Sequence, residues 1–406
     1  MENPKIRFKG FTKDWEQRKL GDYLEVSKEK NRDEGFGKED VLSVSGEFGI
    51  VNQIEFQGRS FAGASVKNYG VVEVFDIVYT KSPLKSNPYG IIKTNKGKAG
   101  IVSTLYAVYK PKNNVDSEFI QIYFELDSRM NSYMHPLVNK GAKNDMKVSD
   151  ENALKGPVIF PRIEEQKMIS RYFSNLDHLI TLHQRKCEQT KKLKKYMLQK
   201  MFPQNGAKVP EIRFDGYTYD WEQRKVSELS EKTFGGGTPK TSNYSFWKGN
   251  IPWIQSSDLI EDSLFDVEPR KYISKEAVDK SATKLVPENS VAIVTRVGVG
   301  KLAFMPFSYA TSQDFLSLCE LQTEPQFIVY ALYKKLKLEF NAVQGTSIKG
   351  ITKDELLAQK IMIPCYEEQG KIGNYLHSLD HLITLHQRKC DELKKMKKYM
   401  LQNMFI

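Results

Sequence analysis

Polar and basic side chains gather in several glycine- and proline-rich stretches of this 406-residue sequence. Arg and Lys can pair with guanine, Asn and Gln with adenine, and small hydroxyl residues can approach phosphates. Each residue taken singly is typical of an ordinary surface loop, whereas the loops taken as sets favour DNA. The candidate contact residues are Lys81, Ser82, Lys85, Asn87, Tyr89, Lys143, Asn144, Lys147, Thr238, Lys240, Ser256, Ser257, Arg296, Lys301, Gln313, Ser347 and Lys349.

The charge balance agrees with a polyanionic partner. With 61 Lys+Arg against 50 Asp+Glu, the formal net charge is +11 at pH 7. Basic proteins often bind nucleic acid. Positive charge can also serve solubility alone, so the charge supports the loop argument without deciding it.

Several stretches approach catalytic motifs without completing them. Ser86-Asn87-Pro88-Tyr89 resembles the Asn-Pro-Pro-Tyr loop of adenine methyltransferases but lacks the second proline. Val297-Gly298-Val299-Gly300-Lys301 lacks the spacing and the final Ser/Thr of a phosphate-binding loop. His178 and His183 are five residues apart, so they would not stack on one helix face as metal ligands. We therefore predict no catalytic residue and no metal site.

The sequence also bears on the compartment. No apolar run reaches membrane-spanning length, and Met1 to Lys5 are not followed by the apolar core of a secretion signal. The 4 cysteines have no CxxC spacing, which favours free thiols in a reducing compartment. We expect a cytoplasmic protein without a membrane partner.

Two blocks of the sequence occur twice. Residues 4–19 recur as residues 210–225, with 12 of 16 positions identical. Residues 176–202 recur as residues 379–405, with 22 of 27 positions identical. A repeat of this kind indicates that the fold is built from duplicated units.

The stretches between the repeated blocks differ from each other. A Pro-x-x-Glu-Glu-Gln motif precedes the second block in both copies, beginning at Pro161 and at Pro364. The inserts 20–160 and 226–363 have similar lengths but little common sequence. Two similar frames that hold two different inserts favour two reading heads on a common support.

Residues 165–201 and their copy are predicted to be long helices, because no Pro or Gly interrupts the first of them. Apolar or small residues recur at alternating spacings of three and four, which is typical of a coiled-coil seam. Gly370 and Gly373 predict a later start or a bend in the second helix. The seam residues are Leu176, Ile180, His183 and Cys187 in the first copy, and Leu379, Ile383, His386 and Cys390 in the second.

The helix length predicts a geometry. About 36 residues at roughly 1.5 Å each form a rod of about 54 Å. If the two rods pair antiparallel, the inserts lie at opposite ends and can face one duplex about one turn apart, roughly 34–36 Å. The order of the repeats also predicts a pseudo-two-fold axis and termini that lie close together.

The C-terminal halves of both helices are basic. Two interpretations remain open for them: solvated helix ends that complement the helix dipole, or contacts to phosphate or a partner. The residues are Lys191, Lys192, Lys194, Lys195, Lys394, Lys395, Lys397 and Lys398.

Both inserts show strand-like alternation punctuated by Gly, Asn and Pro, with helices expected at 118–130 and 326–340. The predicted fold class is α+β, with two globular α/β domains separated by two long helices that form an antiparallel coiled coil in a pseudo-two-fold cyclic arrangement. The expected segments are an N-terminal repeat (1–19), a first recognition domain (20–160), a central repeated helical region and linker (161–225), a second recognition domain (226–363) and a C-terminal repeated helix (364–406).

This arrangement resembles the specificity subunits of Type I restriction-modification systems. The Pro-x-x-Glu-Glu-Gln entries carry the resemblance, and the second insert adds Gly236-Gly237-Thr238-Pro239, Ile251-Pro252-Trp253-Ile254, Arg296-x-Gly298 and Gly345-Thr346. The first insert lacks the Gly-Gly-Thr-Pro loop, and Asp76 to Tyr79 and Gly141 to Lys147 are its counterparts.

The resemblance implies that each insert is a target recognition domain that reads a few base pairs of double-stranded DNA. It implies partners: two methyltransferase subunits that carry S-adenosylmethionine, and restriction subunits that use ATP and Mg to translocate and cut DNA. The chain itself would hold no cofactor and catalyse nothing. Two alternatives remain: a coiled-coil scaffold that binds nucleic acid or proteins without reading sequence, and an enzyme with an unrecognised site.

Overall fold

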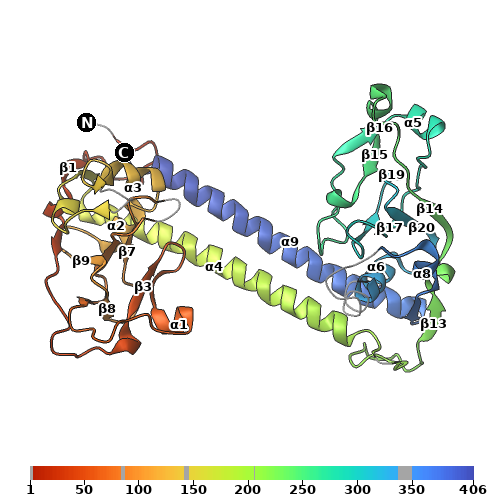
Figure 1. Cartoon of the computed structure of the whole chain (residues 1–406), viewed down its shortest axis with the longest axis horizontal. Helices are drawn as coiled ribbons and strands as arrows, with labels where there is room; N and C mark the ends of the chain where they lie inside the picture. Colours follow the sequence, from red (N-terminus) through yellow and green to blue (C-terminus); the bar gives the residue numbers. More distant parts are fainter. Residues whose placement is uncertain (1–2, 84–86, 141–145, 205, 337–349) are drawn as a thin grey trace. The chain divides into compact units, whose positions relative to one another are not determined.

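The computed structural model describes residues 3–83, 87–140, 146–204, 206–336 and 350–406. The chain forms two compact units, which are drawn in Figure 1. Unit 1 comprises residues 1–184 and 388–406, and unit 2 comprises residues 185–387. Each unit therefore contains one insert, the first part of one long helix and the last part of the other.

Unit 1 is mostly β-structure with short helices. Its elements are β1 (Glu16–Lys19), β2 (Leu24–Val26), β3 (Leu42–Ser45), β4 (Gly49–Asn52), α1 (Gln53–Gln57), β5 (Gly70–Val72), β6 (Ile77–Thr80), β7 (Ile92–Thr94), β8 (Gly100–Val102), β9 (Tyr106–Pro111), α2 (Ser117–Tyr123), α3 (Asp127–Met134), β10 (Asn139–Lys140), β11 (Met146–Lys147), β12 (Pro157–Phe160) and the start of α4 (Ile163–Lys200).

Unit 2 has the same kind of composition. It contains the end of α4, β13 (Glu222–Lys225), β14 (Ser230–Gly235), β15 (Ile251–Ile254), β16 (Lys271–Ile273), α5 (Lys275–Lys280), β17 (Ser290–Val294), β18 (Leu302–Met305), β19 (Ala310–Thr311), β20 (Phe315–Leu321), α6 (Pro325–Tyr333), α8 (Lys353–Ala358), β21 (Lys360–Ile363) and the start of α9 (Tyr366–Asn403).

The two inserts share one sheet topology despite their different sequences. Unit 1 has a four-stranded antiparallel sheet of order β2-β9-β6-β7, and unit 2 has the order β14-β20-β17-β18. In each sheet the strand that comes first in the sequence pairs with the one that comes last, and a hairpin completes the sheet. A helix follows the last strand in both, α2 in unit 1 and α6 in unit 2.

The inserts also differ beyond this common sheet. Unit 1 adds the β3–β4 hairpin and the β5–β8 pair, whereas unit 2 adds a sheet of order β16-β15-β19. The shared sheet is therefore the support, and the added strands are the part that distinguishes the two inserts.

The repeated blocks form the joints between each insert and its helices. Strand β1 pairs antiparallel with β12, and β13 pairs with β21, so that each insert begins and ends in one two-stranded ribbon. The Ile6 N–H donates to the Asn403 carbonyl, as the Ile212 N–H donates to the Lys200 carbonyl, both at 2.9 Å. The predicted proximity of the chain ends is confirmed at Ile6 and Asn403, and Figure 1 shows it.

A repeated ion pair explains why Arg and Glu recur in the two blocks. Arg7 forms two hydrogen bonds to the Glu165 carboxylate, and Arg213 does the same to Glu368 at 2.8 Å. Both glutamates are buried and belong to the Pro-x-x-Glu-Glu-Gln motifs. The bidentate geometry fixes the angle at which the segment before each insert meets its helix.

The glutamine of each motif also forms two defined hydrogen bonds. The Gln166 side chain donates to the Pro161 carbonyl and accepts from the Asp116 N–H, next to the start of α2. Gln369 donates to the Pro364 carbonyl and accepts from the Glu324 N–H, next to the start of α6. The motif therefore ties the long helix to the short helix of the insert.

The predicted seam is largely buried in α4 and α9. Leu176, Ile180, Cys187, Leu379 and Cys390 are buried. His183, Ile383 and His386 are half-buried. In unit 2 the helices run antiparallel. Cys187 of α4 lies by Ile383 and Gln387 of α9. Lys194, which comes later in α4, pairs with Asp380, which comes earlier in α9.

Two lysines of the basic helix ends form ion pairs with carboxylates, and of these Lys194 is buried and Lys397 is half-buried. Lys194 donates to Asp380 at 2.5 Å in unit 2, and Asp380 also accepts from the Tyr330 hydroxyl. At the matching position in unit 1, Lys397 donates to both Asp177 and Glu125 at 2.6 Å. A polar pair inside a helix seam favours one register over its alternatives.

The expectation of a late start or a bend at Gly370 and Gly373 is wrong, since α9 is one helix from Tyr366 to Asn403. A Cβ on Gly373 would lie 2.6 Å from the Glu324 carboxylate, which caps α6. The matching residue in α4 is Ser170, which donates to the shorter cap Asp116 at 2.7 Å. The glycine therefore makes room for the longer capping side chain.

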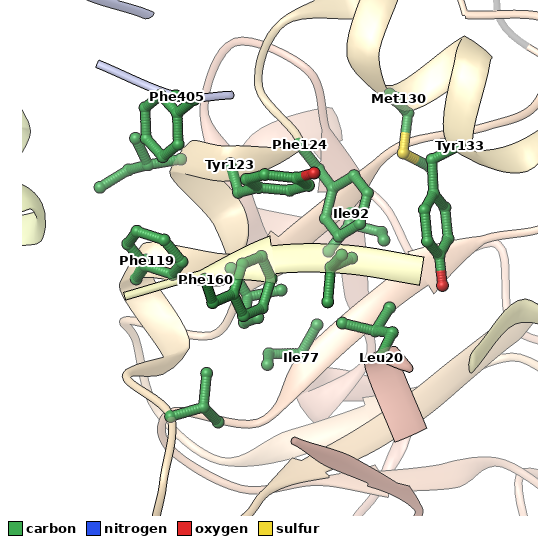
Figure 2. Packing of buried hydrophobic residues seen from close by; sticks show 14 of the residues in the cluster. Leu20, Ile77, Ile92, Phe119, Tyr123, Phe124, Met130, Tyr133, Phe160 and Phe405 are labelled. Atoms are coloured by element: carbon green, nitrogen blue, oxygen red, sulfur yellow. The ribbon is translucent and has the colours of Figure 1, made fainter. Parts of the chain in front are cut away.

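The helix expected at 118–130 is divided into α2 and α3. Arg129 donates to the Tyr123 carbonyl at the end of α2 and to the Leu401 carbonyl in α9, so one side chain satisfies two helix ends. Figure 2 shows the core around this break, where Phe405 from the α9 end lies beside Phe119 and Tyr123. The helix expected at 326–340 is observed as α6, and the rest of that range lies outside the described residues except for 334–336.

Candidate nucleic-acid interface

Loops from distant parts of unit 2 meet at one end of its four-stranded sheet. The Gly237 N–H donates to the Thr311 carbonyl at 2.8 Å, and the Ser312 N–H donates to the Ile254 carbonyl at 2.9 Å. The Thr295 N–H donates to the Asp314 carbonyl at 2.7 Å. These bonds join the loops after β14, β15 and β17 to the turn between β19 and β20.

The sequence-predicted residues of this loop group lie largely at the surface. Thr238, Lys240, Ser257, Arg296 and Gln313 are exposed, and Ser256 is half-buried. The Thr238 hydroxyl donates to the Gln313 side chain at 2.6 Å, which links two of the loops. The five exposed side chains thus present two cations, two hydroxyl groups and an amide to a ligand at this end of the sheet.

Lys301 has a different place from the other candidates. Its ammonium donates to the Leu259 carbonyl at 3.1 Å, and the residue is half-buried. This bond joins the loop after β17 to the loop after β15. The side chain holds the two loops together, so we leave it out of the proposed contact set.

Gly236 and Gly237 allow the loop after β14 to lie directly against its neighbours. A Cβ on Gly236 would lie 1.8 Å from the Ser312 carbonyl oxygen, and one on Gly237 would lie 2.6 Å from the Ala282 backbone. The Gly237 carbonyl accepts from the Trp253 indole and from the Thr283 hydroxyl. The loop bearing Thr238 is therefore held by backbone contacts that any side chain would disturb.

Gly236→Ala is expected to lower the stability of the chain by about 1–3 kcal/mol, because its methyl group overlaps a backbone atom. The neighbouring Gly235→Ala serves as the control, since a Cβ there meets nothing within 4 Å. Urea unfolding measures the stability of both variants, and a duplex-binding assay should show weaker binding for Gly236→Ala alone. Equal behaviour of the two variants would contradict the role given to this loop.

In unit 1 the structure separates the predicted residues. Lys81 pairs with Asp150 at 3.0 Å and Ser82 is half-buried, both directly after β6. Asn87 and Tyr89 are buried: Asn87 donates to Asp127, and the Tyr89 ring packs edge-on against His135. We therefore place Lys81 and Ser82 near the sheet end and leave Asn87 and Tyr89 out of the proposed contact set.

Five other candidates lie outside the described residues: Lys85, Lys143, Asn144, Ser347 and Lys349. The backbone of Lys147 belongs to β11, which pairs with β10.

Unit 1 also carries an exposed aromatic group that was not predicted from the sequence. Phe48, Phe56 and Phe61 are exposed, the rings of Phe48 and Phe56 are 5.4 Å apart, and the Arg59 guanidinium lies 4.5 Å from the Phe61 ring centre. The alternating residues on either side of Gly46 to Gly49 were the available signal for the β3–β4 hairpin that carries Phe48.

The described residues also bear on metal binding and on membrane insertion. Within the part of the chain that the structure describes, no group of three or more His, Cys, Asp or Glu residues could hold a metal ion. No helix in that part is long and apolar enough to cross a membrane.

Comparisons with known proteins agree on one family. The family model described as Type I restriction modification DNA specificity domain matches residues 12–192 and again residues 219–395. The chain is 24% identical over 407 residues to a putative type I restriction enzyme MjaX specificity subunit of Methanocaldococcus jannaschii, covering 96% of this chain and 92% of that protein. It is 32% identical over 175 residues to the EcoR124I/EcoR124II specificity subunit of Escherichia coli, covering 40% of this chain and 41% of that protein.

Solved structures show the same fold. The crystal structure of a Type-I restriction-modification system S subunit from M. genitalium aligns with a TM-score of 0.59 at 12% identity, covering 100% of this chain and 99% of that chain. A chain from a study of complex assembly and conformational transition of the type I R-M system aligns with a TM-score of 0.52 at 18% identity, covering 97% of both chains.

Proposed function

Because the chain belongs to the Type I restriction modification DNA specificity domain family, we propose that it reads a two-part DNA target for a Type I restriction-modification complex. Each insert, 20–160 and 226–363, is one target recognition domain that reads one part. The chain supplies sequence recognition and catalyses no reaction.

One observation carries this proposal. The two inserts have a common sheet topology, β2-β9-β6-β7 and β14-β20-β17-β18, although their sequences differ. Each is fastened to the long helices by the same Arg–Glu pair and the same glutamine bonds. A duplicated support that carries different loops suits the reading of two different half-sites.

In the second domain, the loops at the end of the sheet supply the contacts. Lys240 and Arg296 are exposed cations that can approach phosphate or the guanine edge, and Gln313 can bond adenine. Thr238, Ser256 and Ser257 contribute small hydroxyl groups beside them. In the first domain, Lys81 and Ser82 hold the equivalent place after β6.

The helices α4 and α9 form the spacer, as an antiparallel coiled coil with a pseudo-two-fold axis between the halves. The burial of Leu176, Ile180, Cys187, Leu379 and Cys390 supports the seam. The matched polar pairs Lys194–Asp380 and Lys397–Asp177 support a single register. With the register fixed, the distance between the two half-sites is set by helix length.

Partner subunits dock on an apolar stripe of the same helices. Each stripe residue lies one position before a position of the seam repeat, which continues with the same spacing to Lys194 and Met197 and to Lys397 and Met400. This places the stripe on one side of each helix, and these sides of an antiparallel pair form one face. Contiguous exposed apolar patches mark protein–protein interaction sites. The residues are Leu179, Leu182, Met396 and Tyr399 in unit 1, and Leu193, Tyr196, Leu382 and Leu385 in unit 2.

The occurrence of the stripe in both units supports two copies of one partner, which we assign to methyltransferase subunits. S-adenosylmethionine would be bound by those subunits, and ATP and Mg by the restriction subunits. The scaffold alternative explains the helices, but it gives no reason for two different loop sets on one sheet topology.

Replacing residues 226–363 by the corresponding insert of another family member tests the proposal. We expect one half of the DNA target to change completely, while the other half and the gap stay as they were. Selection of bound duplexes from a random pool, with the original chain in parallel, measures both halves. A change in both halves would contradict the independence of the two domains.

A further inference from the structure

Unit 1 contains a recess of about 430 Å³ that the proposed DNA contacts do not use. The turn of the β3–β4 hairpin forms one wall, β7 and α2 form the floor, and residues of α4 and α9 form the opposite wall. Its volume falls within the roughly 300–1,000 Å³ of small-molecule sites. The recess therefore has the size to hold a ligand.

The charged residues that line the recess are four lysines, Lys93, Lys96, Lys394 and Lys397, and three carboxylates, Glu47, Glu125 and Asp177. Lys96 pairs with Glu118 at 3.0 Å, and Lys397 pairs with Glu125 and Asp177. Burial acts to lower the pKa of Lys397, but these two carboxylates outweigh it, so that the pKa is raised. The charges of Lys96 and Lys397 are thus already balanced by acidic neighbours.

Lys93 differs from the other three. It lies on β7 and is only 7% exposed, yet its side chain makes no hydrogen bond or ion pair with any of the described residues. Burial lowers the pKa of this ammonium group, and the charges of Glu125 and Asp177, which act to raise the pKa, only partly offset it. Holding a buried cation without a hydrogen-bonded partner costs free energy, and a bound anion would reduce that cost.

Unit 2 shows that the fold does not require this lysine. Val78 pairs with Lys93 in unit 1, and the matching Ala292 pairs with Ala303 in unit 2. The match follows from one hydrogen bond at the start of each strand, since the Phe75 N–H donates to the Asn95 carbonyl as the Asn289 N–H donates to the Met305 carbonyl. Unit 2 thus has a buried alanine where unit 1 has a buried lysine.

We propose that the recess binds a phosphate monoester of about the size of a mononucleotide. Lys93 and Lys394 receive the phosphate oxygens, since Lys96 and Lys397 are engaged with carboxylates. The hydroxyl group of Thr181 adds a polar contact from the wall that α4 forms. The Phe48 ring, exposed on the hairpin turn, offers an apolar surface for the organic part of the ligand.

Such a ligand would brace the first recognition domain against the helices. It would touch the β3–β4 turn on one side and α4 and α9 on the other, all within unit 1. In the second domain, the equivalent strand β18 carries Ala303 at the place of Lys93. The proposal goes beyond DNA reading and does not depend on it.

Calorimetric titration of the full chain with inorganic phosphate, adenosine 5′-monophosphate and adenosine tests the proposal. We expect the monophosphate to bind more tightly than phosphate, and adenosine not to bind. Lys93→Met should weaken monophosphate binding by about 10- to 100-fold, as expected for the loss of one charge-assisted contact. Lys98→Met, on an exposed lysine of the same segment outside the recess, should bind as the original chain does.

Thermal unfolding separates this result from a folding defect. Without ligand, Lys93→Met should unfold at the same temperature or higher, because it replaces a buried charge with an apolar side chain of similar length. Failure of the original chain to bind either phosphate or the monophosphate would overturn the proposal, as would equal binding by Lys93→Met. Displacement of the monophosphate by a short DNA duplex whose own binding requires Lys93 would instead assign the recess to the DNA backbone.

Discussion

Duplicating Leu179 to Arg185 in α4 and Leu382 to Arg388 in α9 is expected to lengthen the gap in the DNA target by about two or three base pairs, with both half-sites unchanged. The two seven-residue segments are identical in sequence, and one heptad keeps the seam in phase. Seven residues at roughly 1.5 Å add about 10.5 Å of helix. Three base pairs also rotate the duplex by roughly a quarter turn, so the new site should bind more weakly than the original.

Two control variants sharpen this experiment. The same insertion in α4 alone should impair the chain, because the matched pairs Lys194–Asp380 and Lys397–Asp177 can no longer form together. A four-residue insertion in both helices should also fail, since it shifts the seam out of phase. Selection of bound duplexes measures the gap directly. An unchanged gap in the seven-residue variant would show that the helices do not set the spacing.

Arg213→Met is expected to lower the free energy of unfolding by about 3–5 kcal/mol, because it leaves a buried carboxylate without its partner. The Glu368 side chain is 0% exposed and Arg213 is 15% exposed, with 2.8 Å between the guanidinium Nε and the carboxylate Oε1. The pair also raises the pKa of Arg213 through the hydrogen bond to Glu368. Urea unfolding of the full chain measures the loss.

Replacing Glu368, the partner of Arg213, as well supplies the decisive comparison. The double variant Arg213→Met with Glu368→Leu should recover most of the stability, since no charge then remains buried. Arg224→Met removes an arginine from an exposed pair with Glu222 and should cost less than about 1 kcal/mol. If Arg213→Met cost no more than Arg224→Met, the repeated Arg–Glu pair would not be the joint between the insert and its helix.

The long helices and their seam could be predicted because the signal is periodic and occurs twice. The spacing of Leu176, Ile180 and Cys187 predicts which face is buried, and the structure buries it. The role of Gly373 in α9, by contrast, could not be predicted from the sequence. The space that Gly373 leaves is filled by Glu324, almost fifty residues earlier, and no local pattern predicts such a contact.

The common sheet of the two inserts could not be predicted by comparing their sequences. A strand requires alternation and apolar volume, and many sequences meet both demands. Among the site residues, Thr238 and Arg296 lie in exposed loops, as polar residues beside glycines often do. Asn87 and Tyr89 have similar neighbours in sequence but are buried, because Asp127 and His135 on and beside α3 pack against them.

Selection of DNA from a random duplex pool by the purified full chain tests the central claim most directly. We expect two short defined elements of different sequence, separated by a gap of fixed length and undefined sequence. Raising the salt concentration should weaken binding to unrelated duplexes more than binding to the selected ones. Recovery of one continuous element, or of no common sequence at all, would contradict two recognition domains that read one interrupted target.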